Sequence, residues 1–408
     1  MTAAGGRRLE HALIWVLFVA THLWLAYANL ELRPGTFADV TGVYRYWFEL
    51  AASGHVVGID ESWVYPPLAW LPIALSGVLG AEAYGFVWLV IVGVLDAVAV
   101  LLLLRMRNGT ALAFAFITLQ FLIGPVAVGR LDTITAALAV IAVVAAVEGR
   151  LAVAATLLTA GAWIKVWPGV LFIALLIAYG RDAWRRILAA GAAVSAVVVA
   201  AALLLGSGSH VLSFVSQQGG RGLQAEAPLA TPYLWLVPSG RAEVAFDRDI
   251  LTYQVTGPGS DLVAAVSTAL LLLAVAAIAL LAWRAARRGA SRLDLFALSG
   301  YALILALIVT NKVGSPQFFT WLLPIAVLLV MRGIRTHAVE LLLLAIGAFL
   351  TQLVFPWAYG DVLGATPTGL AMITIRNAVE AGLLVVAIVR LSRIREADAV
   401  LPPPRPAR

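Results

Sequence analysis

The chain has 408 residues, of which 62% are hydrophobic and only 12% are charged, and it contains no cysteine. A soluble globular surface needs about twice that share of charge, so the composition excludes an ordinary soluble protein and predicts a polytopic membrane protein. The lack of cysteine excludes disulfides and thiolate metal sites. The formal net charge of +6 indicates membrane topology and not nucleic-acid binding, because the basic residues alternate with apolar segments.

Arginine clusters separate the apolar segments, and their positions predict the topology. Positive residues are enriched in cytoplasmic loops, so we place every cluster on the cytoplasmic side. This choice puts both termini in the cytoplasm and gives about twelve transmembrane passes. The clusters are Arg7/Arg8, Arg105/Arg107, Arg150, Arg181/Arg185/Arg186, Arg284/Arg287/Arg288/Arg292, Arg332/Arg335 and Arg390/Arg393/Arg395.

The chain begins with a predicted span at about residues 11–29, whose apolar run is long for the core of a cleaved signal peptide. The first outer loop, 31–82, follows, and we expect it to hold juxtamembrane helices on the outer side. One of them, 68–79, is too short to cross the membrane easily. The next predicted spans are 83–104, 110–128 and 132–148. Asp132 is placed to cap the last of these three helices.

The segment 151–179 carries cytoplasmic arginines at both ends but is only about 29 residues long, too short for two full crossings. A single crossing would put one arginine cluster on the wrong side. We therefore expect two short half-spans that meet near Lys165. Non-helical backbone at membrane depth is tolerated only when it is buried in protein or lines a cavity, so Lys165 should face a cavity.

A span at 187–205 leads to the second outer loop, 206–260, which is rich in Gly, Pro, Ser and Gln. The remaining predicted spans are 261–283, 295–310, 318–331, 338–355 and 369–390. We expect residues 1–395 to form one all-α transmembrane domain. Residues 396–408 are rich in Pro and Arg, which predicts a disordered cytoplasmic tail.

Nine of the 28 basic residues fall outside or at the outer ends of spans, against the usual bias. Both lysines of the chain, Lys165 and Lys312, belong to this group. A cation at membrane level is costly unless it meets an anion, which is either a protein carboxylate or the phosphate of a lipid carrier. The nine are Arg33, Arg45, Arg130, Lys165, Arg221, Arg241, Arg248, Lys312 and Arg376.

Asp39 follows the first span in a segment with several aromatic residues, which suit the water–lipid interface. A carboxylate there could remove a proton from an acceptor hydroxyl as a general base. Tyr44, Arg45 and Tyr65 of the same loop would support it. The alternative is that Asp39 caps a helix that starts at Val40, and its position alone does not decide between the two.

Other polar residues have simpler explanations. Asp96 lies in the inner half of its span, which favours a hydrogen-bonded structural role. Arg376 and Glu380 are one helical turn apart and can pair. The motif Asp247-Arg248-Asp249 has the D-x-D form of metal-dependent sugar transferases, but three residues in a polar loop are a weak signal.

Six segments, in order along most of the chain, resemble the GT-C superfamily of membrane glycosyltransferases and, within it, glycosyltransferase family 87. This family includes polyprenol-phosphate-mannose-dependent mannosyltransferases. The segments are FADVTGVYRYW around Asp39, YPPLAWLP at 65–72, GRLD at 129–132, IKVWP at 164–168, RGLQAEAP at 221–228 and NKVGSPQFFTWLLP at 311–324. At GRLD the sequence departs from the family pattern, in which Gln is commoner than Arg130.

The resemblance implies transfer of one sugar, most simply mannose, from a polyprenyl-phosphate carrier to a lipid or glycan acceptor, with inversion at the anomeric carbon. It implies a GT-C-like bundle and a catalytic base at Asp39. Other residues in matching segments or near the outer side are assigned by inference to the donor phosphate or sugar. They are Lys165, Arg221, Gln224, Glu226, Lys312, Ser315, Gln317, Arg130 and Arg376.

Two other function classes stay open. A lipid-linked-sugar flippase or transporter would need a continuous polar path, whereas the ionisable residues gather on the outer side. A polysaccharide polymerase or ligase shares the outer face and the lipid-phosphate leaving group. A single base with surrounding cations predicts no cofactor, although the sequence does not exclude a divalent metal. High Ala, Val and Arg with little Lys indicates a GC-rich bacterium, so we expect a bacterial plasma membrane. The placement of Asp39 and the external cations puts the active site on its outer side.

Overall fold

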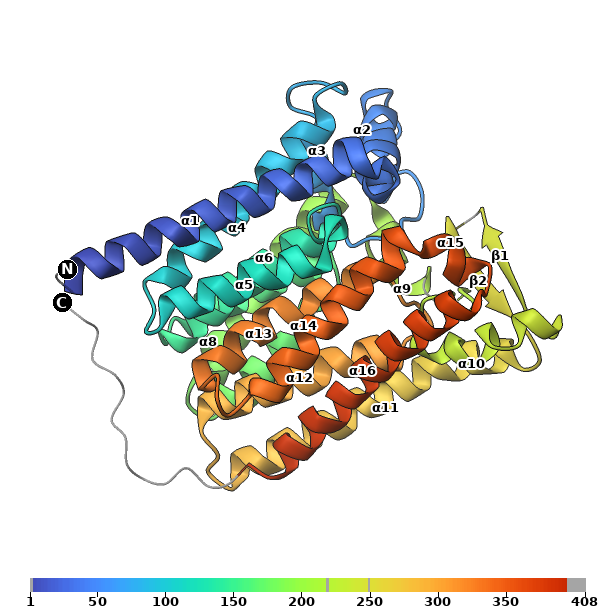
Figure 1. Cartoon of the computed structure of the whole chain (residues 1–408). Helices are drawn as coiled ribbons and strands as arrows, with labels where there is room; N and C mark the ends of the chain where they lie inside the picture. Colours follow the sequence, from blue (N-terminus) through green and yellow to red (C-terminus); the bar gives the residue numbers. More distant parts are fainter. Residues whose placement is uncertain (1–2, 218–219, 249, 395–408) are drawn as a thin grey trace.

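The computed structural model describes residues 3–217, 220–248 and 250–394. Long helices run side by side between two ends of the molecule (Figure 1). They are α1 (Ala3–Tyr27), α4 (Tyr84–Leu104), α5 (Gly109–Ile123), α6 (Leu131–Val147), α7 (Leu151–Ile164), α8 (Pro168–Leu204), α11 (Ser260–Arg287), α12 (Arg292–Val309), α13 (Leu323–Arg332), α14 (Ala338–Gln352) and α16 (Pro367–Ser392).

Short elements gather at one end, which we call the loop end (Figure 1). They are α2 (Arg45–Ala52), α3 (Trp70–Ser76), α9 (Ser213–Ser216), α10 (Thr231–Leu234), α15 (Tyr359–Leu363) and the strands β1 (Glu243–Asp247) and β2 (Thr252–Thr256). The opposite end, which we call the arginine end, carries ion pairs between neighbouring helices. Arg292 pairs there with Asp182, and Arg390 pairs with Glu340.

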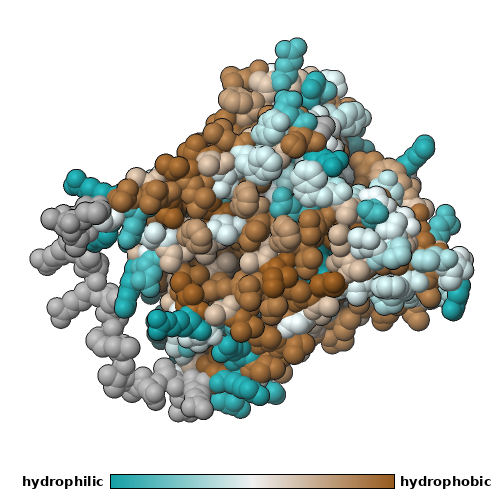
Figure 2. Space-filling model, viewed as in Figure 1, coloured by the Kyte–Doolittle hydropathy of each residue, from teal (hydrophilic) through white to brown (hydrophobic). Residues whose placement is uncertain are grey.

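An apolar band lies between the two ends (Figure 2), as a membrane-spanning bundle requires. Among the described residues, seven helices are long and apolar enough to cross a membrane, and five shorter apolar helices accompany them. The prediction of an all-α polytopic membrane protein is confirmed. The figure of about twelve passes stays a prediction, although a helical segment lies at each position where a span or half-span is expected.

Helix α8 doubles back on itself near Arg181. A Cβ added to Gly191 would lie 2.9 Å from the ring of Phe172, whereas a straight helix would separate the two positions by about 28 Å. Trp163 of α7 donates to Ser195 in the returning arm, at 3.0 Å. The chain breaks between α7 and α8 at Lys165, which has extended backbone angles. This agrees with the predicted two short helices that meet near Lys165.

The second outer loop is more ordered than the sequence prediction allowed. Strands β1 and β2 pair antiparallel, with Glu243 opposite Thr256. The segment 223–225 adds to β2, because Ala225 donates to the carbonyl of Tyr253 and Val255 donates to that of Leu223. Both strands contain aromatic and β-branched residues, which favour a sheet. The predicted tail, 396–408, lies outside the described residues.

Candidate active site

Asp39 lies at the loop end, in a π-helical turn over Asp39–Tyr44 that follows α1. Phe37, Val40 and Tyr44 are buried and anchor this turn against the bundle. Ala38 is the N-cap of this turn and Asp39 is its first residue, so the capping alternative finds no support. Its Oδ2 lies 2.9 Å from Nε of Arg130, and the Asp39 side chain remains 35% exposed. The carboxylate is therefore held in place but open to a substrate.

Arg130 comes from the connection between α5 and α6 and is almost fully buried. Besides Asp39, it donates to the backbone carbonyls of Thr36, at 2.6 Å, and Gly129, at 2.7 Å. Its guanidinium thereby ties the first loop to the tip of the α5–α6 hairpin. We expected Arg130 to bind the donor phosphate, but in the structure it forms an ion pair with Asp39, the predicted base.

Asp132 was missed as a site residue, and the prediction that it caps α6 is wrong. It lies inside the first turn of α6, and the N-cap of this helix is Arg130. Its Oδ1 accepts from Nε1 of Trp321, at 2.7 Å. Its Oδ2 lies 3.3 Å from Nζ of Lys165. A fully buried carboxylate needs such a cationic partner, and the sequence contains no local signal that pairs residues 132 and 165.

Aromatic rings of the first loop lie next to the Lys165 end of the second ion pair. The ammonium of Lys165 lies 4.6 Å from the centre of the Tyr65 ring, and Tyr65 meets Tyr44 edge to face. The Tyr44 hydroxyl has no hydrogen-bond partner among the described residues, and burial raises its pKa well above the ordinary value. Arg45, in contrast, pairs with Glu49 on an exposed surface and does not join the site.

Two more cations converge on the same end. Burial lowers the pKa of Arg221, while Tyr65 and Asp247 act in the opposite direction. Burial also lowers the pKa of Lys312, and the charge of Arg221 lowers it further. Tyr65 of the first loop thus acts on Arg221, and Arg221 acts on Lys312 in the segment after α12. Arg221 and Lys312 therefore share one electrostatic environment.

A hydrogen-bonded wall continues from Lys312 to α15. The backbone N–H of Gln224 donates to the carbonyl of Lys312, at 2.9 Å, and its side-chain amide donates to Ser315, at 3.2 Å. Glu226 is buried and accepts from the Tyr359 hydroxyl, at 2.8 Å. Burial raises the pKa of Glu226, and the Tyr359 hydrogen bond opposes this shift.

Two other predicted donor-site residues have structural contacts. Arg376 is buried, donates to the carbonyl of Glu226 and lies 3.7 Å from Glu380, as its spacing predicted. Gln317 lies in the 3-10 turn Pro316–Leu322, and its backbone carbonyl accepts from the Thr320 hydroxyl. Asp96 has the structural role expected of it, because it contacts His22 and accepts from Gln120.

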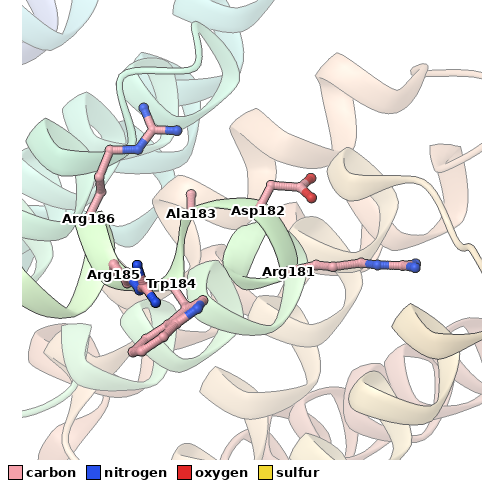
Figure 3. A pocket seen from close by; sticks show the side chains of 6 residues that line it. All are labelled: Arg181, Asp182, Ala183, Trp184, Arg185 and Arg186. Carbon is pink, nitrogen blue, oxygen red and sulfur yellow. The ribbon is translucent and has the colours of Figure 1, made fainter.

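A surface hollow at the arginine end does not belong to this site. It is lined by Arg181, Asp182, Ala183, Trp184, Arg185 and Arg186 of α8. Arg181 and Arg186 point away from each other (Figure 3), so they do not converge on one ligand. In the described part of the chain, no three His, Asp or Glu residues are grouped as metal ligands.

The arrangement is that of a helical membrane protein with a partly exposed carboxylate and several cations at one end of the bundle. The model of glycosyltransferase family 87 matches residues 63–311, which is more than half of the 408 residues. The chain therefore belongs to glycosyltransferase family 87 and is a GT-C-type glycosyltransferase. The match includes Arg130, Asp132 and Lys165, and it begins after Asp39. Among curated proteins, none matches the chain.

Proposed function

We propose that this glycosyltransferase transfers one mannose from a polyprenyl-phosphate carrier to a hydroxyl of a lipid or glycan acceptor on the outer face of the membrane. The observation that carries the proposal is the carboxylate of Asp39, which is held by Arg130 and partly exposed. Asp39 and Lys165 are close enough to interact electrostatically. A base next to cations suits a reaction in which a hydroxyl attacks and a phosphate leaves.

In the proposed reaction, Asp39 takes the proton of the acceptor hydroxyl as the acceptor oxygen attacks the anomeric carbon. The bond between that carbon and the phosphate oxygen breaks, and polyprenyl phosphate leaves from the opposite face, which inverts the configuration. The phosphate group changes from a monoanionic diester to a dianionic monoester. Lys165 holds the phosphate before and during the reaction, Arg221 and Lys312 stabilise the added charge, and an already acidic leaving group needs no protonating acid.

The hydrogen-bonded wall beyond Lys312 supports a place for the donor sugar. Gln224 and Ser315 offer donors and acceptors next to the cations, and these groups suit sugar hydroxyls. Since these contacts come from two separate segments, the sugar would bind only when the loop end is assembled as it is here.

The test is transfer of radiolabelled mannose from polyprenyl-phosphate mannose in membranes that contain the native protein or Asp39→Asn. We expect transfer by the native protein and a loss of about a thousandfold in the variant, as for removal of a general base. Glu49→Gln is the matched control, because Glu49 is an exposed first-loop acid that pairs with Arg45. It should retain native activity.

Full activity in a folded Asp39→Asn protein would show that the base lies elsewhere. Lack of transfer from the mannosyl donor by the native protein would contradict the choice of sugar, and polyprenyl-phosphate arabinose is the next donor to assay. Failure with both donors would contradict the proposed carrier.

A further inference from the structure

Asp132 and Lys165 form an ion pair whose two members differ in their access to the site. The side chain of Asp132 is fully buried, whereas that of Lys165 is 19% exposed. Asp132 therefore cannot contact a substrate, but Lys165 can. Replacing a buried ion pair by apolar residues is often neutral or stabilising, so stability alone is a weak reason for this pair.

The surroundings of the pair fix both partners. Trp321 donates to Asp132 and stacks on Trp167, with the ring planes 10° apart. Trp167 donates to Thr135, and Thr135 donates to the carbonyl of Asp132. Trp167 lies two residues beyond Lys165. These bonds therefore tie the break between α7 and α8 to the first turn of α6. This network holds the carboxylate in one orientation.

The ammonium of Lys165 has three donors. One side faces Oδ2 of Asp132, and the Tyr65 ring lies 4.6 Å from Nζ. Tyr65 also meets Tyr44 edge to face, and Tyr44 lies in the same turn as Asp39. The ammonium therefore lies next to the part of the first loop that carries the proposed base.

We propose that Asp132 is a positioning residue, which fixes the ammonium of Lys165 so that its exposed side binds the phosphate of the lipid-linked donor. This inference rests on the proposed function for the identity of the ligand. Asp132 acts through Lys165 and not on the reacting atoms. Its removal should weaken donor binding much more than it slows the chemical step.

The first test needs no activity. Lys165 and Lys312 are the only lysines, so acylation of the two side chains by an amine reagent can be compared within one protein by peptide mass spectrometry. A nearby carboxylate keeps an ammonium charged and unreactive. Asp132→Asn should raise the ratio of Lys165 to Lys312 labelling about tenfold, whereas Asp361→Asn, an exposed acid at the loop end, should leave it unchanged.

The second test is kinetic. Asp132→Asn keeps an acceptor for Trp321 but loses the charge, and it should raise the KM for the donor about tenfold or more while kcat changes less than about threefold. If Asp132 acts only through Lys165, the double variant Asp132→Asn/Lys165→Gln should bind the donor no more weakly than Lys165→Gln. If Lys165→Gln does not fold because Asp132 is left unpaired, the double variant is compared with Asp132→Asn. The donor KM of the double variant should then be at least as high as that of Asp132→Asn.

The outcomes separate this inference from the proposed function. Polyprenyl phosphate, added before the reagent, should protect Lys165 in the native protein. Protection without sugar transfer would overturn the transfer proposal but support the phosphate contact. An unchanged labelling ratio in Asp132→Asn, a fall in kcat with the donor KM unaltered, or no protection by polyprenyl phosphate would each overturn the positioning role.

Discussion

The two ends of the bundle both hold buried charges, but they use them differently. At the arginine end, Asp294 pairs with Arg332, and Glu340 pairs with Arg390. His337 lies between them, and both His337 and Glu340 are only 1% exposed. In this network two acids face two arginines, and the network joins α12, α13, α14 and α16. The network has a structural role, because it holds these four helices together, and we call it the arginine-end lock.

At the loop end, the charged groups of the candidate site include side chains that are open to solvent. Among these groups are the bases Arg130, Lys165, Arg221 and Lys312 and the acids Asp39, Asp132 and Asp247. Asp39 is 35% exposed. The difference teaches that charge at membrane level indicates function only where the protein leaves a charged group accessible.

The largest expected effect is that of Arg130→Lys, which tests whether the charges at the loop end serve catalysis. Lysine keeps the positive charge but lacks the planar fork that joins Asp39 to the carbonyls of Thr36 and Gly129. A displaced base should lower kcat about a hundredfold, measured as initial rates of sugar transfer. Arg45→Lys is the control, because in the described part of the chain Arg45 pairs with exposed Glu49. Native kcat in folded Arg130→Lys would show that Arg130 does not orient the base.

Glu340→Gln tests the other half of the comparison. The variant leaves Arg390 and His337 without their carboxylate, which should cost about 2 kcal/mol, below the usual range for a broken buried pair because Arg390 stays partly hydrated. The unfolding temperature in detergent should fall, while the donor KM and kcat of the folded protein stay native. Glu148→Gln, which removes a more exposed pair with Arg150, is the control. A changed donor KM would mean that the two ends are coupled.

Gly314→Ala tests whether the hydrogen-bonded wall next to Lys312 binds the donor. An added Cβ would lie 2.3 Å from Cα of Ala227 and 2.5 Å from its backbone nitrogen, so one of the two segments must move. The shift would disturb the contact between Gln224 and Ser315, and we expect the donor KM to rise about tenfold. Gly42→Ala, whose added Cβ would meet nothing within 4 Å, should match the native protein. An unaltered KM would place the donor away from this wall.

The sequence predicts the helices well because hydropathy and arginine position are local properties. The break at Lys165 could be predicted, since a segment with cytoplasmic arginines at both ends is too short for two full spans. The match of family 87 to residues 63–311 confirms the family resemblance. The β1–β2 hairpin was missed because its two short strands lie in a Gly- and Pro-rich segment that indicates a loop.

The pairings within the site could not be predicted in the same way. Asp39 meets Arg130 across 91 positions of the chain, and Asp132 meets Trp321 across 189. Nothing in the local pattern distinguishes Asp132 from a helix cap, because both start an apolar helix. Arg45 has the same charge as Arg130 and lies nearer to Asp39 in sequence, yet a helical turn directs it to Glu49. Only the packing of separate helices decides such contacts.

The smallest predicted effect concerns the pH dependence of the arginine-end lock. Nε2 of His337 accepts from Arg332 at 2.8 Å, and Nδ1 donates to Glu340 at 3.1 Å, an arrangement that requires a neutral ring. Burial lowers the pKa of His337 below its ordinary value of 6.5, and Arg332 and Arg390 lower it further, against the effect of Glu340. The unfolded chain therefore binds a proton that the folded protein does not. This contribution to stability is complete above pH 6.5 and is lost as the pH falls from there through the lower pKa of the folded state.

The slope from this single group is at most about 1.4 kcal/mol per pH unit, and thermal unfolding in detergent between pH 5 and 8 would measure it. Because other groups titrate over the same range, the decisive quantity is the difference between the native protein and His337→Gln. The variant should lose less stability on acidification, whereas His55→Gln, at an exposed site beside Glu61, should follow the native curve. Parallel curves for the native protein and His337→Gln would mean that the ring takes up its proton without opening the lock, and the arginine end would then be less tightly closed than its burial indicates.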